Sequence, residues 1–456
     1  MNPKLNYLFV IRGSIFTVAF IVYLFNMFFS SQTLEMLLNV ISILLFMTAI
    51  IGVARFYFIM AFVFLGGSIT LAIVRDVSWL DMISGFSTMV KLVLFIGMIP
   101  LISTPIENYM STIKRMIRSL NQRVSSFQVC HLTTFILANF INMAAIPISK
   151  TIFFQDGTAE ERHVKSELSL RAFGLAMMCS PIGAAVALAI DITGTKWISL
   201  LSINLIIIVV GLFLSYQLSK RSRLQISQNI QIEKVIMQKH DYVLLGAIFI
   251  PFFLYFIFLL LSERFFSIGM METIVMSVLP FTFLWSLVIK KVPEWWDTCR
   301  LQVFKKTPNF FGQFSVIISA GLLVHTFELT GLNKSLTHML PGIGTSSFVF
   351  LYIPVAILLV LILSILGVHQ FVAMIFTSQI IHPGALGINP IIFASALLVG
   401  FASGMLASAF SGATITMSGL LQGTSSYMVA RKNYPFSVIF IVISSVVLIL
   451  LNFMLT

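Results

Sequence analysis

Apolar runs long enough to cross a lipid bilayer follow one another from end to end of this chain. A transmembrane helix needs roughly 20 predominantly apolar residues, and such runs recur with no polar domain between them. Of the 456 residues, 58% are hydrophobic and 10% are charged, which leaves too little polar surface for a water-soluble body of this size. We therefore predict an all-α polytopic membrane protein with about 11 transmembrane helices.

The basic residues fall between these runs, almost all of them in every second gap. All but five of the 28 lysines and arginines lie on one side of the predicted membrane; Arg75, Lys196, Arg264 and Lys334 lie on the other, and Lys91 lies within a span. Cytoplasmic loops carry the excess of basic residues. We therefore predict a plasma-membrane protein with a cytoplasmic N-terminus and an external C-terminus. The net charge of +12 reports this orientation and gives no separate support for nucleic-acid binding.

Interrupted apolar segments occupy corresponding places in the two halves of the chain. The first half has a predicted hairpin at 126–155 and a predicted broken helix at 168–194. The second half has a predicted hairpin at 346–382 and a predicted broken helix at 388–421. Paired interruptions of this kind indicate a transporter built from inverted repeats. Treating both hairpins as re-entrant places the large basic loops on one side of the membrane, which supports the inversion.

The domain organisation follows from this pairing. We predict an N-terminal span at 1–32, a first inverted repeat at 33–218, a cytoplasmic linker at 219–240 and a second inverted repeat at 241–456. The basic stretches at 105–123 and 290–306 are expected to lie flat at the cytoplasmic interface, the first because its apolar residues recur at helical spacing.

The order of spans, interfacial stretch, hairpin and broken helix resembles the ion transporter superfamily, which includes divalent anion/sodium symporters, arsenite permeases and citrate carriers. The hairpins read ANFINMAAIP and LGVHQFVAM, the helices after them read CSPIGAAVALAIDITG and SAFSGATITMSG, and the span before the second hairpin ends in HTFELTGL. The Ser-Asn-Thr hairpin tips of the symporter branch are absent from both hairpins. The resemblance implies an elevator-type secondary transporter, coupled to Na⁺ or H⁺, that moves a small anion or polar organic solute.

Unwound backbone at membrane depth is tolerated where it is buried in protein or lines a water-filled cavity, so the interruptions are the expected substrate site. The predicted substrate-binding residues are Asn139, Asn142, Ser180, Gly183, His369, Gln370, Ser408, Ser411, Thr414 and Thr416. The alternative to substrate binding is that the small residues among them pack helices together. The proton-coupling candidates are ionisable groups near or within spans, namely His369, Glu328, Asp191 and Lys91. The alternative to proton coupling is exposure at the membrane interface for Asp191 and Glu328. For Lys91 it is snorkelling to the interface or pairing with another side chain.

No phosphate-binding glycine loop, metal-spaced cluster or nucleophile-base pair occurs in the sequence, so we expect no enzyme activity and no cofactor beyond Na⁺ as a coupling ion. The expected partners are a small-molecule substrate, the lipid bilayer and a second copy of the chain. The second copy would bind through the scaffold helices, which are the spans that do not move with the substrate. The alternative function is a flippase or exporter of a lipid-linked or amphipathic substrate, for which 44 Phe and 23 Met residues would provide a soft apolar lining.

Overall fold

Every regular element that the structure describes is a helix, as the apolar runs predict. The structure is a computed structural model, and it describes residues 3–107, 109–121, 124–154, 158–220, 237–266, 268–333, 335, 349–421 and 423–455. Within these ranges, 11 helical segments are long and apolar enough to cross a membrane. The prediction of an all-α, multi-pass membrane protein is therefore confirmed at this level.

The chain divides into two compact units, each assembled from segments far apart in the sequence. Unit 1 consists of Met1–Leu101, Met271–Ile343 and Phe371–His382, and unit 2 of Ile102–Met270, Gly344–Gln370 and Pro383–Thr456. The predicted inverted repeats divide the chain at its middle instead, and they stay a prediction. Most of the predicted linker at 219–240, and the start of the predicted hairpin at 346–382, lie outside the described residues.

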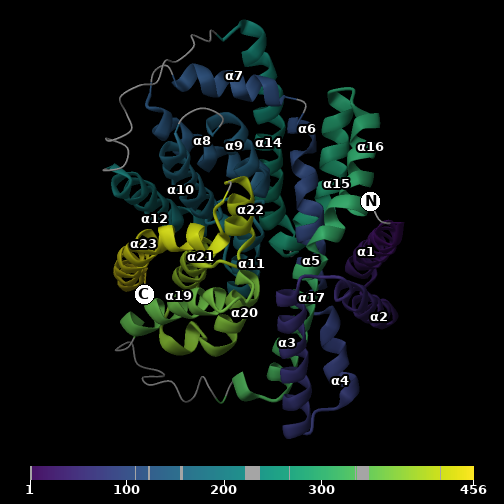
Figure 1. Cartoon of the computed structure of the whole chain (residues 1–456). Helices are drawn as coiled ribbons and strands as arrows, with labels where there is room; N and C mark the ends of the chain where they lie inside the picture. Colours follow the sequence, from purple (N-terminus) through teal and green to yellow (C-terminus); the bar gives the residue numbers. More distant parts are fainter. Residues whose placement is uncertain are drawn as a thin grey trace. The chain divides into compact units, whose positions relative to one another are not determined.

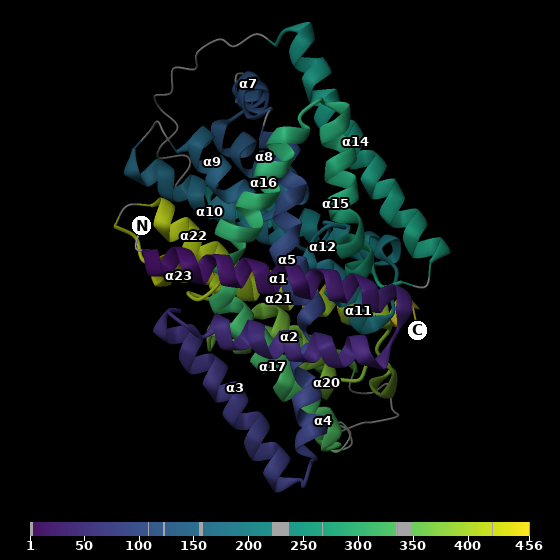
Figure 2. The same cartoon turned by 90° about the vertical axis from the view of Figure 1, so that its right-hand side faces the viewer.

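Unit 1 is built around the long helix α17. Its main helices are α1 (Pro3–Phe29), α2 (Gln32–Ala49), α3 (Arg55–Val74), α4 (Trp79–Ser84), α5 (Val90–Met98), α15 (Met270–Val288), α16 (Val292–Leu301), α17 (Phe311–Leu329) and α20 (Gln370–Ile380). The first residues of α15 and α20, Met270 and Gln370, belong to unit 2. A π-helical turn, η4 (Gln302–Lys306), and a 3₁₀ turn, η5 (Thr307–Phe310), join α16 to α17. Helix α17 packs against α3 and α2, and α1 lies beside α2 (Figures 1 and 2).

Arg12 fixes α1 to the end of α2. A helix leaves its last carbonyl groups without intrahelical partners. Nη2 of the buried Arg12 donates to the carbonyl oxygens of Thr48 at 2.9 Å and Ile51 at 2.6 Å, and the guanidinium lies 5.0 Å from the ring centroid of Phe311. The one cation thus binds two carbonyl groups at the end of α2, and it stacks on α17 as well.

Unit 2 contains the first predicted hairpin and the predicted broken helices of both halves. Its helices include α6 (Thr104–Glu107), α7 (Met110–Asn121), α8 (Ser126–Ile141), α9 (Ala145–Phe153), α10 (Ala159–Ala176), α11 (Ala184–Thr193), α12 (Trp197–Leu218), α14 (Lys239–Phe265), α19 (Val349–Ile365), α21 (Pro390–Ala407), α22 (Gly412–Leu420) and α23 (Ser426–Leu455). Helix α21 lies within a group formed by α19, α23, α11 and α12, with which it packs. Small residues allow this packing, because α21 has Ala, Gly or Ser at many of its buried positions.

Helix α7 has the amphipathic character predicted for 105–123. Ile113 and Ile117 are buried, while Lys114 and Arg118 remain partly or fully exposed. Nη2 of Arg115 lies 2.7 Å from Oδ1 of Asp241, which also accepts from the backbone N–H of Gln238 and closes the start of α14. The ion pair therefore joins α7 to the N-terminus of α14, where a carboxylate is favoured by the helix dipole. The interfacial position of α7 stays a prediction.

Candidate functional site

The described part of the predicted hairpin at 126–155, residues 126–154, is a helical hairpin, and its tip is Asn142. Oγ1 of Thr134 on α8 lies 2.8 Å from Oγ of Ser149 on α9, so residues before and after the tip face each other. At Asn142 the backbone takes φ 49° and ψ −130°, a region that glycine adopts far more readily than asparagine. A strained non-glycine residue is a common feature of functional sites. Asn142 is half-buried.

The first broken helix is interrupted between α10 and α11, as predicted for 168–194. Residues 177–183 separate the two helices, and two side chains of α12 satisfy carbonyl groups freed there. Nδ2 of Asn204 donates to the carbonyl oxygen of Met178 at 2.7 Å, and Nε1 of Trp197 donates to that of Cys179 at 3.1 Å. A buried carbonyl without a partner would cost roughly 1–3 kcal/mol. Asn204 and Trp197 thus stabilise an interruption that α10 and α11 cannot satisfy alone.

The hairpin tip is bonded to this break. Sγ of Cys179 donates to Oδ1 of Asn139 at 3.1 Å, and Oγ of the buried Ser180 donates to the Asn139 carbonyl oxygen at 3.0 Å. The structure therefore brings together two predicted site residues from different segments. Gly183 is the N-cap residue of α11, and within the described residues no side chain caps this helix start. Its free N–H groups and dipole make it a place where negative charge is favoured.

The second broken helix is interrupted between α21 and α22, where three buried hydroxyl groups bond to the backbone. Oγ of Ser411 donates to the carbonyl oxygen of Met405 at 2.6 Å, and Oγ1 of Thr414 donates to that of Ser408 at 2.7 Å. Ser411 also caps α22, because its Oγ accepts from the backbone N–H of Thr414 at 3.1 Å. Ser408 and Ser411 with Thr414 therefore hold the shape of the break. Thr416 lies half-buried on α22, outside this network.

Close helix packing surrounds the second break. Oγ of Ser408 donates to the carbonyl oxygen of Ser364 on α19 at 2.6 Å. A Cβ atom added to Gly404 would lie 2.6 Å from Oγ of Ser364 and 3.7 Å from Cγ of Gln370, so Gly404 allows α19 and α21 to approach. Gln370 is buried beside α21, and the preceding His369 is half-buried.

Both breaks belong to unit 2 and are connected by helix packing. Helix α11 packs against α21, α10 against α21 and α22, and the second arm of the hairpin, α9, against α22 (Figure 1). The predicted pairing of two interrupted segments therefore has a physical counterpart in one compact unit. Helix α20, which follows His369, lies almost wholly in unit 1, so the predicted second hairpin is divided between the units.

The ionisable candidates have specific partners. Nζ of Lys91 lies 3.2 Å from Oε1 of Glu272, and Nε2 of Gln379 donates to Oε1 of the exposed Glu328 at 2.6 Å; all four residues belong to unit 1. Oδ1 of Asp191 accepts from the backbone N–H of Met270 at 3.2 Å, at the start of α15. The sequence shows no obvious acidic partner close to Lys91 along the chain, and pairing was one of the alternatives for this residue. Its partner lies 181 residues further along the chain, where sequence spacing cannot reveal it.

A buried cation joins α10 to α23 and was missed by sequence reasoning. Nε of Arg171 donates to Oδ1 of Asn433 at 2.8 Å, and Nη2 lies 3.2 Å from Oε2 of Glu167. Burial raises the pKa of Glu167, while the charges of Arg171 and Lys432 act in the opposite direction. Because all the polar groups in this cluster have protein partners, it anchors the two helices.

Comparison with known proteins shows a shared fold. No family model and no curated protein matches the chain. The structure is similar to the crystal structure of the Alcanivorax borkumensis YdaH transporter, which is described as having an unusual topology. The TM-score is 0.56 at 13% sequence identity, and the match covers 85% of this chain and 97% of that one. The likeness therefore extends over most of both chains, and it concerns the fold.

Proposed function

We propose that this chain is a secondary active transporter that moves a small anion or polar organic solute across the plasma membrane. The observation that carries the proposal is the pair of helix breaks in unit 2, one between α10 and α11 and one between α21 and α22, connected by helix packing. The multi-pass helical architecture and the fold shared with a transporter support it. Broken helices are typical of solute and ion sites in transporters.

The chemistry of the breaks favours an anion over a cation. Several freed carbonyl groups, those of Met178, Cys179 and Ser408 among them, already accept hydrogen bonds from side chains of the protein. At the start of α11, by contrast, no side chain among the described residues caps the backbone N–H groups. A helix N-terminus carries roughly half a positive elementary charge. Asn139, Asn142 and Ser180 would add neutral hydrogen-bonding groups beside it, and His369, Gln370 and Thr416 would extend the site.

Coupling to Na⁺ or H⁺ belongs to the same proposal. His369 is the preferred proton-responsive group, since an unperturbed histidine has a pKa near physiological pH and this residue lies directly before the buried Gln370, where α20 begins. The Lys91–Glu272 pair is the second candidate, because ionisable pairs within apolar spans often mark ion pathways. Asp191 and Glu328 are weaker candidates, because Asp191 accepts from a helix start and Glu328 is exposed.

Alternating access by an elevator-type movement would carry the site across the membrane. The division of the chain into two compact units supports this mechanism, since unit 2 holds the first hairpin and both breaks, whereas unit 1 holds α1, α3 and α17. In this proposal unit 2 moves as a body and unit 1 serves as the scaffold. A homodimer through scaffold helices, a cytoplasmic N-terminus and an external C-terminus complete the proposed arrangement.

Transport by the purified chain in liposomes tests the function. Small organic and inorganic anions are offered beside neutral and cationic solutes of similar size, under an imposed Na⁺ gradient, an imposed proton gradient, or neither. We expect uptake of at least one anion that depends on one of the gradients. Uptake restricted to cations, or uptake that no gradient affects, would contradict the proposal.

The alternative function, movement of an amphipathic or lipid-linked substrate, is favoured by one observation, an apolar cavity of about 440 Å³ in unit 1. The same liposomes can contain a phospholipid with a fluorescent headgroup. Loss of fluorescence from the inner leaflet on addition of an impermeant quencher, without anion uptake, would favour the alternative.

A further inference from the structure

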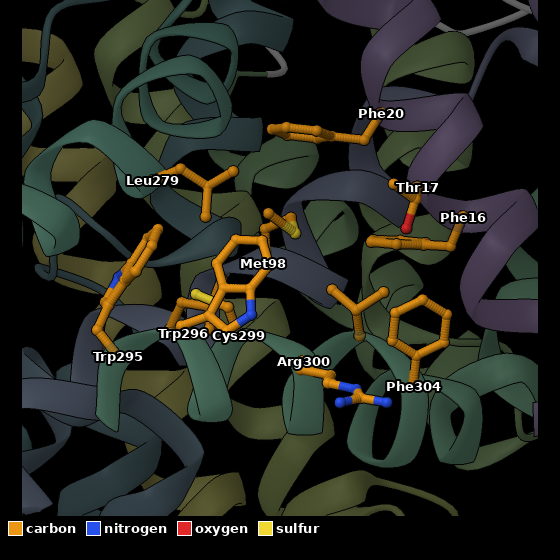
Figure 3. Close-up of a pocket in the computed structure, with 12 residues that line it drawn as sticks. Phe16, Thr17, Phe20, Met98, Leu279, Trp295, Trp296, Cys299, Arg300 and Phe304 are labelled. Atoms are coloured by element: carbon orange, nitrogen blue, oxygen red, sulfur yellow. The ribbon is translucent and has the colours of Figure 1, made fainter. Parts of the chain in front are cut away.

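An apolar cavity in unit 1 lies outside the proposed solute site. It has a volume of about 440 Å³, within the range of roughly 300–1,000 Å³ that is usual for small-molecule sites. Phe16 and Phe20 of α1 form one wall, and Leu279 of α15 lies opposite them (Figure 3). Trp296 and Arg300 of α16 also line the cavity (Figure 3).

A π-helical turn forms part of the cavity wall. The π-helical turn η4 follows α16 directly and contributes Val303 and Phe304 to the lining. The Phe304 ring can lie against α1 because residue 13 is glycine: a Cβ atom there would come within 2.5 Å of Phe304 Cδ1. π-Helical turns occur frequently at functional sites. Gln302, in the same turn, is buried and donates to the Gly97 carbonyl oxygen, which fixes the turn to the end of α5.

One end of the cavity lies beside positive charge. The side chain of Arg300 lines the cavity and is largely exposed, and within the described parts of the chain no hydrogen bond or ion pair engages its guanidinium. Lys305 and Lys306 follow it and are exposed. From 290 to 306 the chain has five basic and two acidic residues, and one of the acids, Glu294, is paired with Lys291 at 3.1 Å.

We propose that this cavity binds one acyl chain of an anionic phospholipid, with the lipid phosphate held by Arg300 and attracted by Lys305 and Lys306. The apolar walls match a hydrocarbon chain, and the guanidinium matches a phosphate, which it can bind through two parallel hydrogen bonds. Trp295 and Trp296 are suited to headgroup depth, where the phosphate of such a lipid would lie. Basic pockets between membrane helices are recognised sites for anionic headgroups. The inference does not depend on the proposed solute transport.

Lipid binding to the full chain in nonionic detergent micelles tests the site. Native mass spectrometry measures the affinity for dioleoyl phosphatidylglycerol and for dioleoyl phosphatidylcholine, whose acyl chains are identical. We expect tighter binding of phosphatidylglycerol, with one molecule bound before the others. Arg300→Gln should reduce that preference about fivefold, the effect of one basic side chain on an anionic lipid. Arg300→Lys should retain part of it, because the charge remains while the two parallel hydrogen bonds are lost.

Two further variants separate the cavity from the charge. Leu279→Trp should fill the cavity and weaken binding of both lipids, whereas Arg75→Gln, which removes an exposed cation elsewhere in unit 1, should change neither. The rise in thermal unfolding temperature on addition of lipid is compared within each variant, so that a less stable variant still gives an answer. Equal affinity for the two lipids, an unchanged preference in Arg300→Gln, or unchanged binding in Leu279→Trp would overturn the assignment.

Discussion

Nδ2 of Asn204 donates a 2.7 Å hydrogen bond to the carbonyl oxygen of Met178, where α10 ends and the chain leaves the helical path. Both residues are buried, and Asn204 lies within the apolar helix α12. A helix break inside an apolar region exposes carbonyl groups that water cannot reach. The stability of the first break therefore depends on an asparagine in another helix.

Replacing Asn204 by leucine should destabilise the protein. The substitution keeps a similar volume but leaves the Met178 carbonyl without its donor, at a cost of roughly 1–3 kcal/mol. Thermal unfolding in detergent, followed by circular dichroism, should show a lower midpoint. Ser202→Ala, at an exposed position on the same helix, provides the control and should leave the midpoint unchanged. Equal midpoints for Asn204→Leu and the parent would mean that the bond adds nothing to stability.

Asn142→Gly should separate folding from function at the hairpin tip. Asparagine at φ 49° carries strain of roughly 1–3 kcal/mol, which glycine relieves. Glycine also makes the unfolded chain more flexible, which costs roughly 0.4–1 kcal/mol. The variant should therefore be as stable as the parent or more stable, but its solute transport in liposomes should fall because the side-chain amide is lost.

Asn142→Ala is the matched comparison, since it loses the amide and increases the strain, because alanine tolerates positive φ less well than asparagine. It should lower both the unfolding temperature and transport. If Asn142→Gly transports the solute as well as the parent does, the Asn142 side chain does not contribute to the site.

The approach of α19 and α21 should be sensitive to one methyl group. Gly404→Ala places a Cβ atom 2.6 Å from Oγ and 2.8 Å from Cβ of Ser364, and overpacking of this kind costs roughly 1–3 kcal/mol. Combining it with Ser364→Gly should recover stability relative to the sum of the single changes, with a coupling energy of roughly 0.5–3 kcal/mol. Gly419→Ala, whose added Cβ meets no atom within 4 Å, should be neutral or slightly stabilising. Strict additivity would exclude the close contact.

Lys91 and Glu272 should behave as a coupled pair. Their side chains are 29% and 31% exposed, so neither charge is fully solvated. Lys91→Met leaves a carboxylate without its cation and should lower the unfolding temperature, whereas adding Glu272→Gln should restore part of the loss. If the pair takes part in proton coupling, the double variant should also lose the dependence of transport on a proton gradient. Independent effects of the two substitutions would show that the 3.2 Å contact is unimportant.

Patterns local in sequence predicted the helical architecture and the positions of the breaks. Long apolar runs indicate membrane helices whatever their neighbours are, and Ser180 with Pro181 marks the first interruption directly. The amphipathic spacing in 105–123 likewise predicts the buried face of α7, including Ile113 and Ile117.

Contacts between distant segments could not be predicted in the same way. Three side-chain partners lie in other helices: Asn204 bonds to Met178, Glu272 pairs with Lys91, and Asn433 bonds to Arg171. Hydropathy does not say which helices are neighbours. A lone asparagine within the apolar run of α12 and an acid near the start of α15 were the available signals. Ser411 and Thr414 were expected to face a substrate. Their hydroxyl groups bond to backbone carbonyls instead, and their role toward a solute stays a prediction.

The most direct test of the proposed function is the accessibility of the hairpin tip from the two sides of the membrane. A single cysteine replaces Met143, the half-buried residue that follows Asn142 at the tip, in a background where Cys130, Cys179 and Cys299 are serine, and an impermeant thiol reagent is applied to right-side-out and to inside-out vesicles. Alternating access predicts modification from both sides, with rates that change in opposite directions when the coupling-ion gradient is imposed. Modification from one side alone, at a rate that no gradient changes, would contradict the account.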